Sequence, residues 1–317
     1  MKIVMNQVHS TNKETGTVYM TKDISPEGLM RTYRALGMKA AGKTAVKISS
    51  GEPGGHHFLS FKLIEPLVKE VNGTIVECNT AYGGRRADTK SHCKVMEEHG
   101  FSTIAPYDIM DADGSIAIPV AGGVHLKEDM VGSHLANYNF IVNLAHFKGH
   151  AMGGFGGVLK NMSIGIASAM GKSLIHSAGK ETTGFGIDTP QDDFLESMAE
   201  AAKAVADYRN GSILYINVMN HLSVDCDCDS HPAPPEMNDI GIFASLDPVA
   251  LDQACVDACL AAAPMPGSQL ARNMAKKDFV DHHDHFRNST PESEWKSCLE
   301  HAEKIGLGSR EYTLIKM

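Results

Sequence analysis

The chain has 317 residues, of which 43% are hydrophobic and 21% are charged, and its formal net charge is −9. This composition is that of a soluble globular protein and excludes a disordered or fibrous chain. The negative net charge gives no attraction to nucleic acid or to an anionic membrane surface, so neither is an expected partner.

Export and membrane insertion are not expected either. The N-terminal stretch, residues 1–17, turns polar after a few residues, and no run of about 18 uncharged apolar residues follows. Seven cysteines are an odd number in a long chain, which argues against a disulfide scaffold and for reduced thiols. We therefore expect a cytoplasmic protein whose cysteines remain available as thiolates.

The first part of the chain alternates predicted strands and helices. Strands are predicted at 45–50 and 74–80, and each is followed by an amphipathic helix, at 58–71 and 87–100. Such a βαβα order implies a parallel sheet with helices on its faces.

The second part continues this pattern around a strongly apolar run. Residues 138–145 form the best candidate for a central strand, because parallel strands buried on both faces are nearly continuous apolar runs. The other predicted strands are 115–120, 212–219, 239–245 and 312–317, and the other helices are 193–208, 247–262 and 291–305. The last-but-one helix begins with Asp247 as N-cap and Pro248 at its first position.

These elements predict an α/β fold with a mainly parallel sheet and helices on both faces. We expect residues 1–317 to form one large unit, with two lobes, 1–135 and 136–317, and a cleft between them as the alternative. Ligands bind at the carboxyl ends of strands in open α/β sheets. Polar stretches follow four predicted strands, at 49–57, 79–90, 146–161 and 220–235, and we expect them to meet in one cleft.

The stretch "HFKGHAMGGFGGVLKN" carries the largest group of candidate residues. His146, Lys148 and His150 alternate, so in an extended segment they share one face. A glycine-rich loop before a helix favours binding of a phosphate or carboxylate on backbone N–H groups. The candidate catalytic residues are Lys148, His150 and Lys160, and the candidate substrate-binding residues here are Gly153, Gly154, Gly156, Gly157 and Asn161. The alternative is a tight glycine turn with solvated histidines.

Two earlier loops offer further ligands for an anion. His56 and His57 in "GEPGGHH" are candidate substrate-binding residues, and a Pro-Gly turn with exposed imidazoles is the alternative. Arg85 and Arg86 in "GGRRAD" are candidates to clamp an anionic substrate, or else are surface charges.

The stretch "NHLSVDCDCDSHPAPP" is the candidate metal site. Thiolates spaced C-x-C can reach one metal, and cysteine ligands favour zinc or iron over magnesium or calcium. The flanking aspartates raise the thiol pKa values, which favours metal ligation over thiol catalysis. The candidate metal ligands are Cys226, Cys228, His146, His150 and His231. An acidic loop with one inward-facing cysteine is the alternative.

The two long blocks at 142–165 and 224–257 together resemble the domain-of-unknown-function family 362, in particular members described as iron-sulfur centre proteins. The resemblance implies an α/β domain with an unsettled reaction. Its signature positions are Lys148, His150, Lys160, Asn161, Cys226, Cys228, Asp247, Pro248 and Asp252. Relatives of this kind often carry two ferredoxin-like cysteine runs after the segment matching 171–177, and this chain has no cysteine there. An iron-sulfur cluster is therefore a weaker expectation than a single transition metal.

Three functions follow from these residues. The first is a metal-dependent enzyme, with redox chemistry as one option, acting on a small anionic molecule. The second is a non-catalytic metal or cluster carrier, or an electron-transfer subunit whose partner is a separate ferredoxin-like protein. The third is a metal-free binder of a phosphorylated or carboxylated metabolite.

Overall fold

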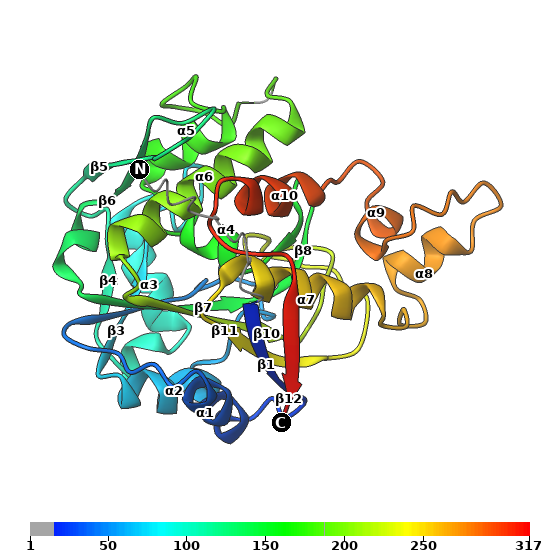
Figure 1. The fold of residues 1–317 in the computed structure, drawn as a ribbon, viewed down its shortest axis with the longest axis horizontal. Coiled ribbons are helices and arrows are strands. Elements are labelled where there is room, and N and C mark those ends of the chain that lie inside the picture. Colours follow the sequence, from blue (N-terminus) through cyan, green and yellow to red (C-terminus); the bar gives the residue numbers. More distant parts are fainter. Residues whose placement is uncertain (1–15, 187) are drawn as a thin grey trace, which may run out of the picture.

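An eight-stranded sheet forms the centre of the computed structural model, which describes residues 16–186 and 188–317 (Figure 1). The strand order is β12-β1-β11-β10-β7-β2-β3-β4, and β11 runs against the other seven strands. The prediction of a mainly parallel sheet is therefore confirmed. The strands are β1 (Gly16–Thr21), β2 (Thr44–Lys47), β3 (Gly73–Glu77), β4 (Tyr107–Ile109), β7 (Phe140–His146), β10 (Ile213–Met219), β11 (Gly241–Ser245) and β12 (Tyr312–Lys316). Residues 1–15, which carry most of the stretch used to judge export, lie outside the described residues.

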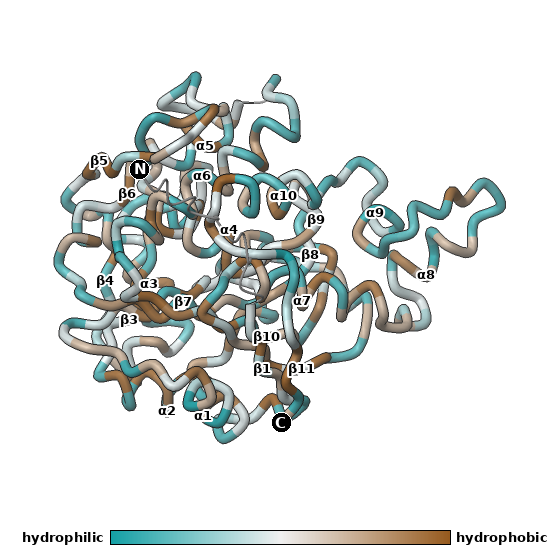
Figure 2. Tube along the Cα trace, in the orientation of Figure 1, coloured by the Kyte–Doolittle hydropathy of each residue, from teal (hydrophilic) through white to brown (hydrophobic). Residues whose placement is uncertain are grey.

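The strand β7 lies inside the sheet between β10 and β2, as its apolar sequence predicts. All seven of its residues are buried, and the hydropathy-coloured trace is brown along this part of the sheet (Figure 2). Val142 and Leu144 belong to the core on one face, whereas Ile141 and Ala145 belong to the core on the other. This alternation is what a strand covered on both faces requires.

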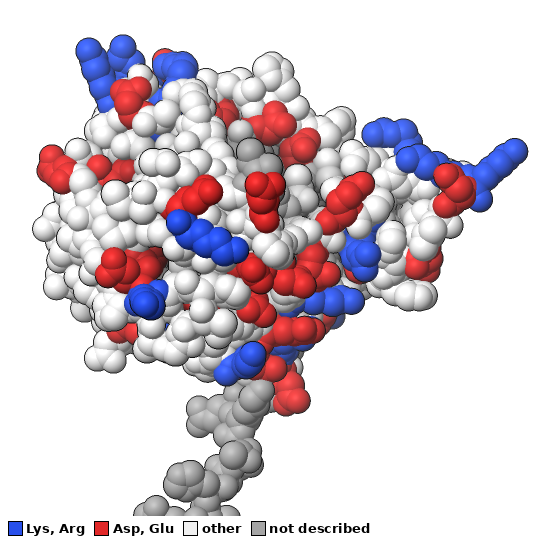
Figure 3. All heavy atoms as spheres, turned by 90° about the horizontal axis from the view of Figure 1, so that it is seen from above, with Lys and Arg blue, Asp and Glu red and all other residues white. Residues whose placement is uncertain are grey.

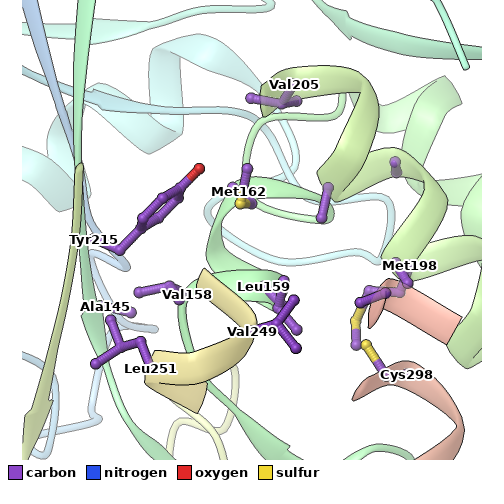
Figure 4. Packing of buried hydrophobic residues seen from close by; sticks show 14 of the residues in the cluster. Ala145, Val158, Leu159, Met162, Met198, Val205, Tyr215, Val249, Leu251 and Cys298 are labelled. Carbon is purple, nitrogen blue, oxygen red and sulfur yellow. The ribbon is translucent and has the colours of Figure 1, made fainter. Parts of the chain in front are cut away.

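Helices cover both faces of the sheet, which confirms the predicted layering (Figure 1). One core contains residues of α1 (Pro26–Ala35), α2 (Phe61–Glu70) and α3 (Thr89–Glu98). The other contains residues of α4 (Val158–Met162), α5 (Ala169–His176), α6 (Gln191–Arg209), α7 (Pro248–Leu260) and α10 (Lys296–Lys304). Figure 4 shows the second core, where Leu159 of α4 lies beside Val249 of α7.

The start of α7 follows the predicted capping pattern. Asp247 accepts hydrogen bonds from the backbone N–H groups of Val249 at 2.9 Å and Ala250 at 3.0 Å, and Pro248 occupies the first turn. The side chain thus satisfies donors that have no partner inside the helix.

The strand predicted at 115–120 forms, but it does not join the central sheet. It is β5 (Ser115–Pro119), which pairs antiparallel with β6 (Glu128–Gly132) in a separate two-stranded sheet. Only Ile118 of β5 is fully buried, so the strand suits a half-exposed hairpin rather than a sheet covered on both faces. A second small sheet pairs β8 (Lys148–His150) with β9 (Gly154–Gly156).

A segment carrying α8 (Gln269–Met274) and α9 (His285–Ser289) projects from one end of the molecule (Figure 1). Lys276 and Lys277 are exposed there, and Figure 3 shows basic side chains on this projection while acidic and basic side chains intermingle over the rest of that face. None of the helices in residues 16–186 and 188–317 is both long and apolar enough to cross a membrane.

Candidate functional site

A cavity of about 260 Å³ lies at the carboxyl ends of β2, β3, β7 and β10. Its lining comes from the four polar stretches that follow these strands, together with residues in and around α5. The lining includes five basic side chains, namely Lys47, Arg86, Lys148, Lys160 and Lys172. The charge partners of these five residues decide what the cavity can bind.

Lys47, at the end of β2, is neutralised by Glu77, at the end of β3. The Lys47 Nζ donates to Glu77 Oε2 at 2.7 Å and to Asn161 Oδ1 at 3.1 Å, and the lysine is 1% exposed. Burial opposes the negative charge of Glu77, but Lys47 and then Arg86 outweigh it and lower the pKa of Glu77 to about 2. The Asn161 amide nitrogen donates to the Lys47 carbonyl and to Asn143. Asn161 therefore lines the cavity, but its polar atoms are already engaged in the fold.

Lys148 is neutralised by Asp227, which stands between the two cysteines of the C-x-C motif. Asp227 Oδ2 accepts from Lys148 Nζ at 2.8 Å, and its Oδ1 lies 2.8 Å from His146 Nδ1. Burial works against the charge of Asp227, yet His146 and Lys148 hold its pKa well below the usual range. The backbone carbonyl of Asp227 also accepts from the Glu52 N–H at 2.9 Å. Asp227 thus fixes its loop to both neighbouring loops.

Arg86 is neutralised by Glu52. Its Nε donates to Glu52 Oε1 at 2.7 Å, and its second terminal nitrogen donates to the Tyr82 hydroxyl at 2.8 Å. Tyr82 in turn donates to Glu52 Oε1 at 2.9 Å. The predicted clamp residue Arg86 therefore lines the cavity as part of a closed hydrogen-bonded triangle.

Among the described residues, Lys160 and Lys172 form no salt bridge with a carboxylate. Lys172 Nζ donates to the Ala167 carbonyl at 2.5 Å. Within residues 16–186 and 188–317, Lys160 Nζ makes neither a hydrogen bond nor a salt bridge. Burial, reinforced by the nearby Lys148, lowers the pKa of Lys160 to about 7. Lys160 is thus a cavity-lining amine whose nearby carboxylate, Asp227, is hydrogen-bonded to Lys148 and not to Lys160 itself.

Two histidines also line the cavity as neutral rings. His150 Nδ1 accepts a hydrogen bond from the Gly153 N–H at 3.0 Å, which leaves Nε2–H as the donor of the neutral ring. Burial, followed by the charge of Lys160, lowers the pKa of His150 well below its ordinary value. Burial likewise lowers the pKa of His176 to about 4, although its hydrogen bond to the Lys172 carbonyl opposes this shift.

The glycine-rich loop does not present the predicted anion-binding N–H groups. The N–H groups of Val158 and Leu159 at the start of α4 both donate to Asp252, at 3.0 Å each. A Cβ on Gly157 would lie 2.3 Å from Asp252 Oδ1, so the glycine is needed to admit this carboxylate. The helix start predicted to hold a substrate anion is therefore capped by a carboxylate of the chain itself.

The individual glycines divide between two roles. Gly156 and Gly157 line the cavity, whereas Gly153 and Gly154 do not. Gly154 has a φ of 69°, a conformation that favours glycine, and a Cβ there would lie 2.9 Å from Trp295. Contact of Gly156 and Gly157 with a substrate stays a prediction, because both line the cavity while the first backbone donors of α4 serve Asp252.

Cys226 and Cys228 are joined by a disulfide bond, so the expectation that all seven cysteines are free thiols was wrong. Their Cα atoms are 5.2 Å apart, and a turn in which the Asp229 N–H donates to the Cys226 carbonyl at 3.0 Å brings them together. Cys226 is buried and Cys228 is exposed, and both line the cavity. The other five cysteines are free.

The predicted metal ligands are not brought together as a ligand set. The two sulfurs are bonded to each other, and both ring nitrogens of His146 face oxygen acceptors, on Asp227 and on the Asn220 carbonyl. His231 is exposed and lies outside the cavity lining. The described part of the chain contains no cluster of three or more His, Cys, Asp or Glu side chains suited to a metal ion. The donor set therefore does not fit a metal in this arrangement.

Besides Gly153 and Gly154, three further predicted substrate-binding residues, His56, His57 and Arg85, lie outside the cavity lining. His56 is exposed, and His57 is buried with its ring 5.5 Å from the ring of His221. Arg85 is exposed and pairs with Glu98 at 2.6 Å. His56 and Arg85 therefore match the alternatives of an exposed imidazole and a surface charge, whereas the buried His57 matches neither interpretation.

Lys47, Glu77 and Lys172 belong to the site but were not among the predicted residues. The signal for the first two was present, because each is a charged residue that ends an otherwise apolar buried strand. Lys172 lies in a helix whose sequence gives no sign of facing a cavity.

The family model for "Domain of unknown function (DUF362)" matches residues 44–257. The chain belongs to this family, as its motifs predicted. No curated protein matches the chain. Among solved structures, the lactate racemase apoprotein from Thermoanaerobacterium thermosaccharolyticum is similar, with 16% identity and a TM-score of 0.41 over 63% of this chain. The match covers 50% of that protein, so this chain spans half of its length. A likeness this distant supports no statement about activity.

Proposed function

We propose that the protein is an enzyme that binds a small anionic substrate in the cavity, with Lys160 as the main charged contact. The observation that carries this proposal is the Lys160 amine, which lines the cavity and makes no hydrogen bond or salt bridge to any described residue, Asp227 acting on it only from beyond hydrogen-bond distance. Unpaired cations are rarely kept in partly buried positions unless an anion completes the site.

The charge balance of the cavity supports the same conclusion. Three of the five basic side chains are paired with carboxylates, Lys47 with Glu77, Arg86 with Glu52 and Lys148 with Asp227. Lys160 and Lys172 remain, so a ligand with one or two negative charges would balance the cavity. Its volume of about 260 Å³ is near the lower end of ligand pockets, roughly 300 Å³, which favours a small metabolite.

The protonation states of the lining residues suit proton exchange near neutral pH. The pKa of Lys160 is lowered by burial to about 7, so both the amine and the ammonium are populated there. His150 adds a neutral ring with Nε2–H as donor, which can hydrogen-bond an anion without adding charge. A substrate held by Lys160 would therefore have a proton donor or acceptor beside it.

Metal-dependent chemistry is not part of this proposal. The disulfide removes both sulfurs as thiolate ligands, and His146 has no free ring nitrogen.

The test is the stabilisation of the purified protein by small anions. Sulfate, phosphate and acetate are each titrated at constant ionic strength with chloride as the balancing ion, and the thermal unfolding midpoint is followed. We expect stabilisation by at least one of them, about 2.7 kcal/mol at a hundredfold excess over its Kd. Lys160→Met should abolish this effect, whereas Lys277→Met, on the exposed projection, should retain it. Equal stabilisation of all three proteins would refute the proposal.

A further inference from the structure

The Cys226–Cys228 disulfide lines the same cavity as Lys160. A cross-link between residues two positions apart closes a very short loop, so it restricts the unfolded chain little. The loop is already fixed by Asp227, whose side chain holds Lys148 and whose carbonyl holds the Glu52 N–H. A purely structural role would therefore add little to the stability of the folded protein.

The two sulfurs differ in the way that thiol–disulfide exchange requires. Cys228 is exposed and can be reached by an incoming thiolate, whereas Cys226 is buried behind it. The Cys228 N–H lies 3.3 Å from Cys226 Sγ and would stabilise a thiolate on that sulfur when the bond opens. Cys228 Sγ is thus the sulfur that an incoming thiolate can attack, and Cys226 Sγ is the sulfur that would leave as a thiolate.

The three aspartates around the cysteines differ in their partners. Asp227 is paired with Lys148, whereas Asp225 accepts from the Ala233 N–H at 2.8 Å and Asp229 accepts from the His231 N–H at 2.7 Å, and such backbone hydrogen bonds do not neutralise a carboxylate. Neither Asp225 nor Asp229 lines the cavity, whereas Lys160 lines it together with both sulfurs.

We propose that Cys226 and Cys228 form a reversible dithiol–disulfide couple that reduces a small anionic disulfide held by Lys160. This inference rests on the proposed function and names its substrate class, low-molecular-weight disulfides that carry a carboxylate. An anionic disulfide suits the cavity, because its lining combines an exchangeable sulfur pair with a site for one negative group.

The electrons balance in two exchange steps. The Cys228 thiolate attacks one substrate sulfur, the substrate S–S bond breaks, and one substrate thiolate leaves. The Cys226 thiolate then attacks the Cys228 sulfur, the second substrate thiolate leaves, and the protein disulfide closes. The two released substrate thiolates take up the two protons that the thiols of Cys226 and Cys228 lost. A dithiol reductant returns the protein to its reduced form by the reverse exchange.

The test compares disulfides of different charge. Protein reduced with dithiothreitol and freed of it is mixed at low salt with 3,3′-dithiodipropionate, 2-hydroxyethyl disulfide or cystamine, which are anionic, neutral and cationic. Closure of the pair is followed by intact mass as the loss of two hydrogen atoms. We expect the anionic disulfide to react roughly tenfold faster than the neutral one, and the cationic one to react more slowly than either.

Variants separate this inference from simpler outcomes. Lys160→Met should lose the preference for the anionic disulfide but still close its pair, Cys228→Ser should not react, and Cys93→Ser, a free thiol outside the cavity lining, should behave as the parent protein. Equal rates with all three disulfides would overturn the substrate class. Stoichiometric zinc or iron held by the reduced pair, and lost in Cys226→Ser, would overturn the redox couple.

The double variant Cys226→Ser, Cys228→Ser distinguishes this failure from failure of the proposed function. If the parent shows no charge preference but the double variant is still stabilised by the small anions, the anion site stands and only the redox inference falls. If anion stabilisation is absent in both proteins, the proposed function falls with it.

Discussion

Asp252 Oδ1 accepts the backbone N–H of Val158 at 3.0 Å, so a carboxylate of α7 caps the first turn of α4. Gly157, the residue before that turn, has no side chain with which to do this. The second oxygen holds the N–H of Leu159, and the next residue is Lys160. Asp252, a signature position without an assigned role in the sequence, therefore sets the position of the proposed anion contact.

Replacing this cap should destabilise the protein strongly. Asp252→Ala leaves three buried donors without their acceptor, on Val158, Leu159 and the Asn217 amide. We expect a loss of about 2–4 kcal/mol in the free energy of unfolding, measured with urea at pH 8. Asp88→Ala, which removes the exposed cap of α3, is the matched control and should cost about 1 kcal/mol. Equal losses in the two variants would contradict the role given to Asp252.

The affinity for sulfate should fall as the pH rises through about 7. Only the protonated form of Lys160 attracts the anion, and burial lowers the pKa of that amine to about 7. Sulfate keeps its charge over this range, so the change reports on the protein. Calorimetry should show a Kd that weakens by up to about tenfold per pH unit above this pKa, with proton uptake on binding. A pH-independent Kd in the parent protein, matching that of Lys160→Met, would contradict the assignment.

Asp129 should lower stability at alkaline pH, because its carboxylate is 1% exposed and neither oxygen has a hydrogen-bond partner in the described structure. Burial raises the pKa of Asp129 to about 7. The folded state therefore binds more protons than the unfolded state between about pH 4 and 7, and stability falls as the pH rises through that window. The gain in stability from Asp129→Asn should be larger at pH 8 than at pH 5, by on the order of 3 kcal/mol, measured by urea unfolding. Glu128→Gln, on the exposed side of the same strand, should show no such gain.

The elements of the fold could be predicted where the local sequence decides them. β7 is an unbroken apolar run, and α7 carries its own cap in Asp247 and Pro248. β8 and β9 were missed because strands of three residues are too short to show any alternation. A helix after the glycine-rich loop was expected, but the bounds of α4 were not predicted, since its cap comes from Asp252, far along the chain.

The site was only partly predictable because charge pairing joins residues that are distant in sequence. Lys148 and Asp227 are 79 positions apart, so the spacing of neither motif reveals that they neutralise each other. Lys160 was singled out together with Lys148, and its lack of a partner becomes visible only when the fold is known. Likewise, the spacing of Cys226 and Cys228 is compatible with a metal or with a disulfide, and the turn at Asp229 decides between them.

The direction of β2 has a practical consequence. Its last residue, Lys47, lines the cavity, whereas residues 37–43, of which Gly37, Lys39 and Lys43 are exposed, lead into the opposite end of the strand. Gly37 has open space around its Cα, and a side chain there would meet no atom within 4 Å. A peptide handle inserted after this glycine would attach the protein to a sensor chip with the cavity facing the solution. Ligands could then be screened on immobilised protein, and the chip surface would not block the cavity.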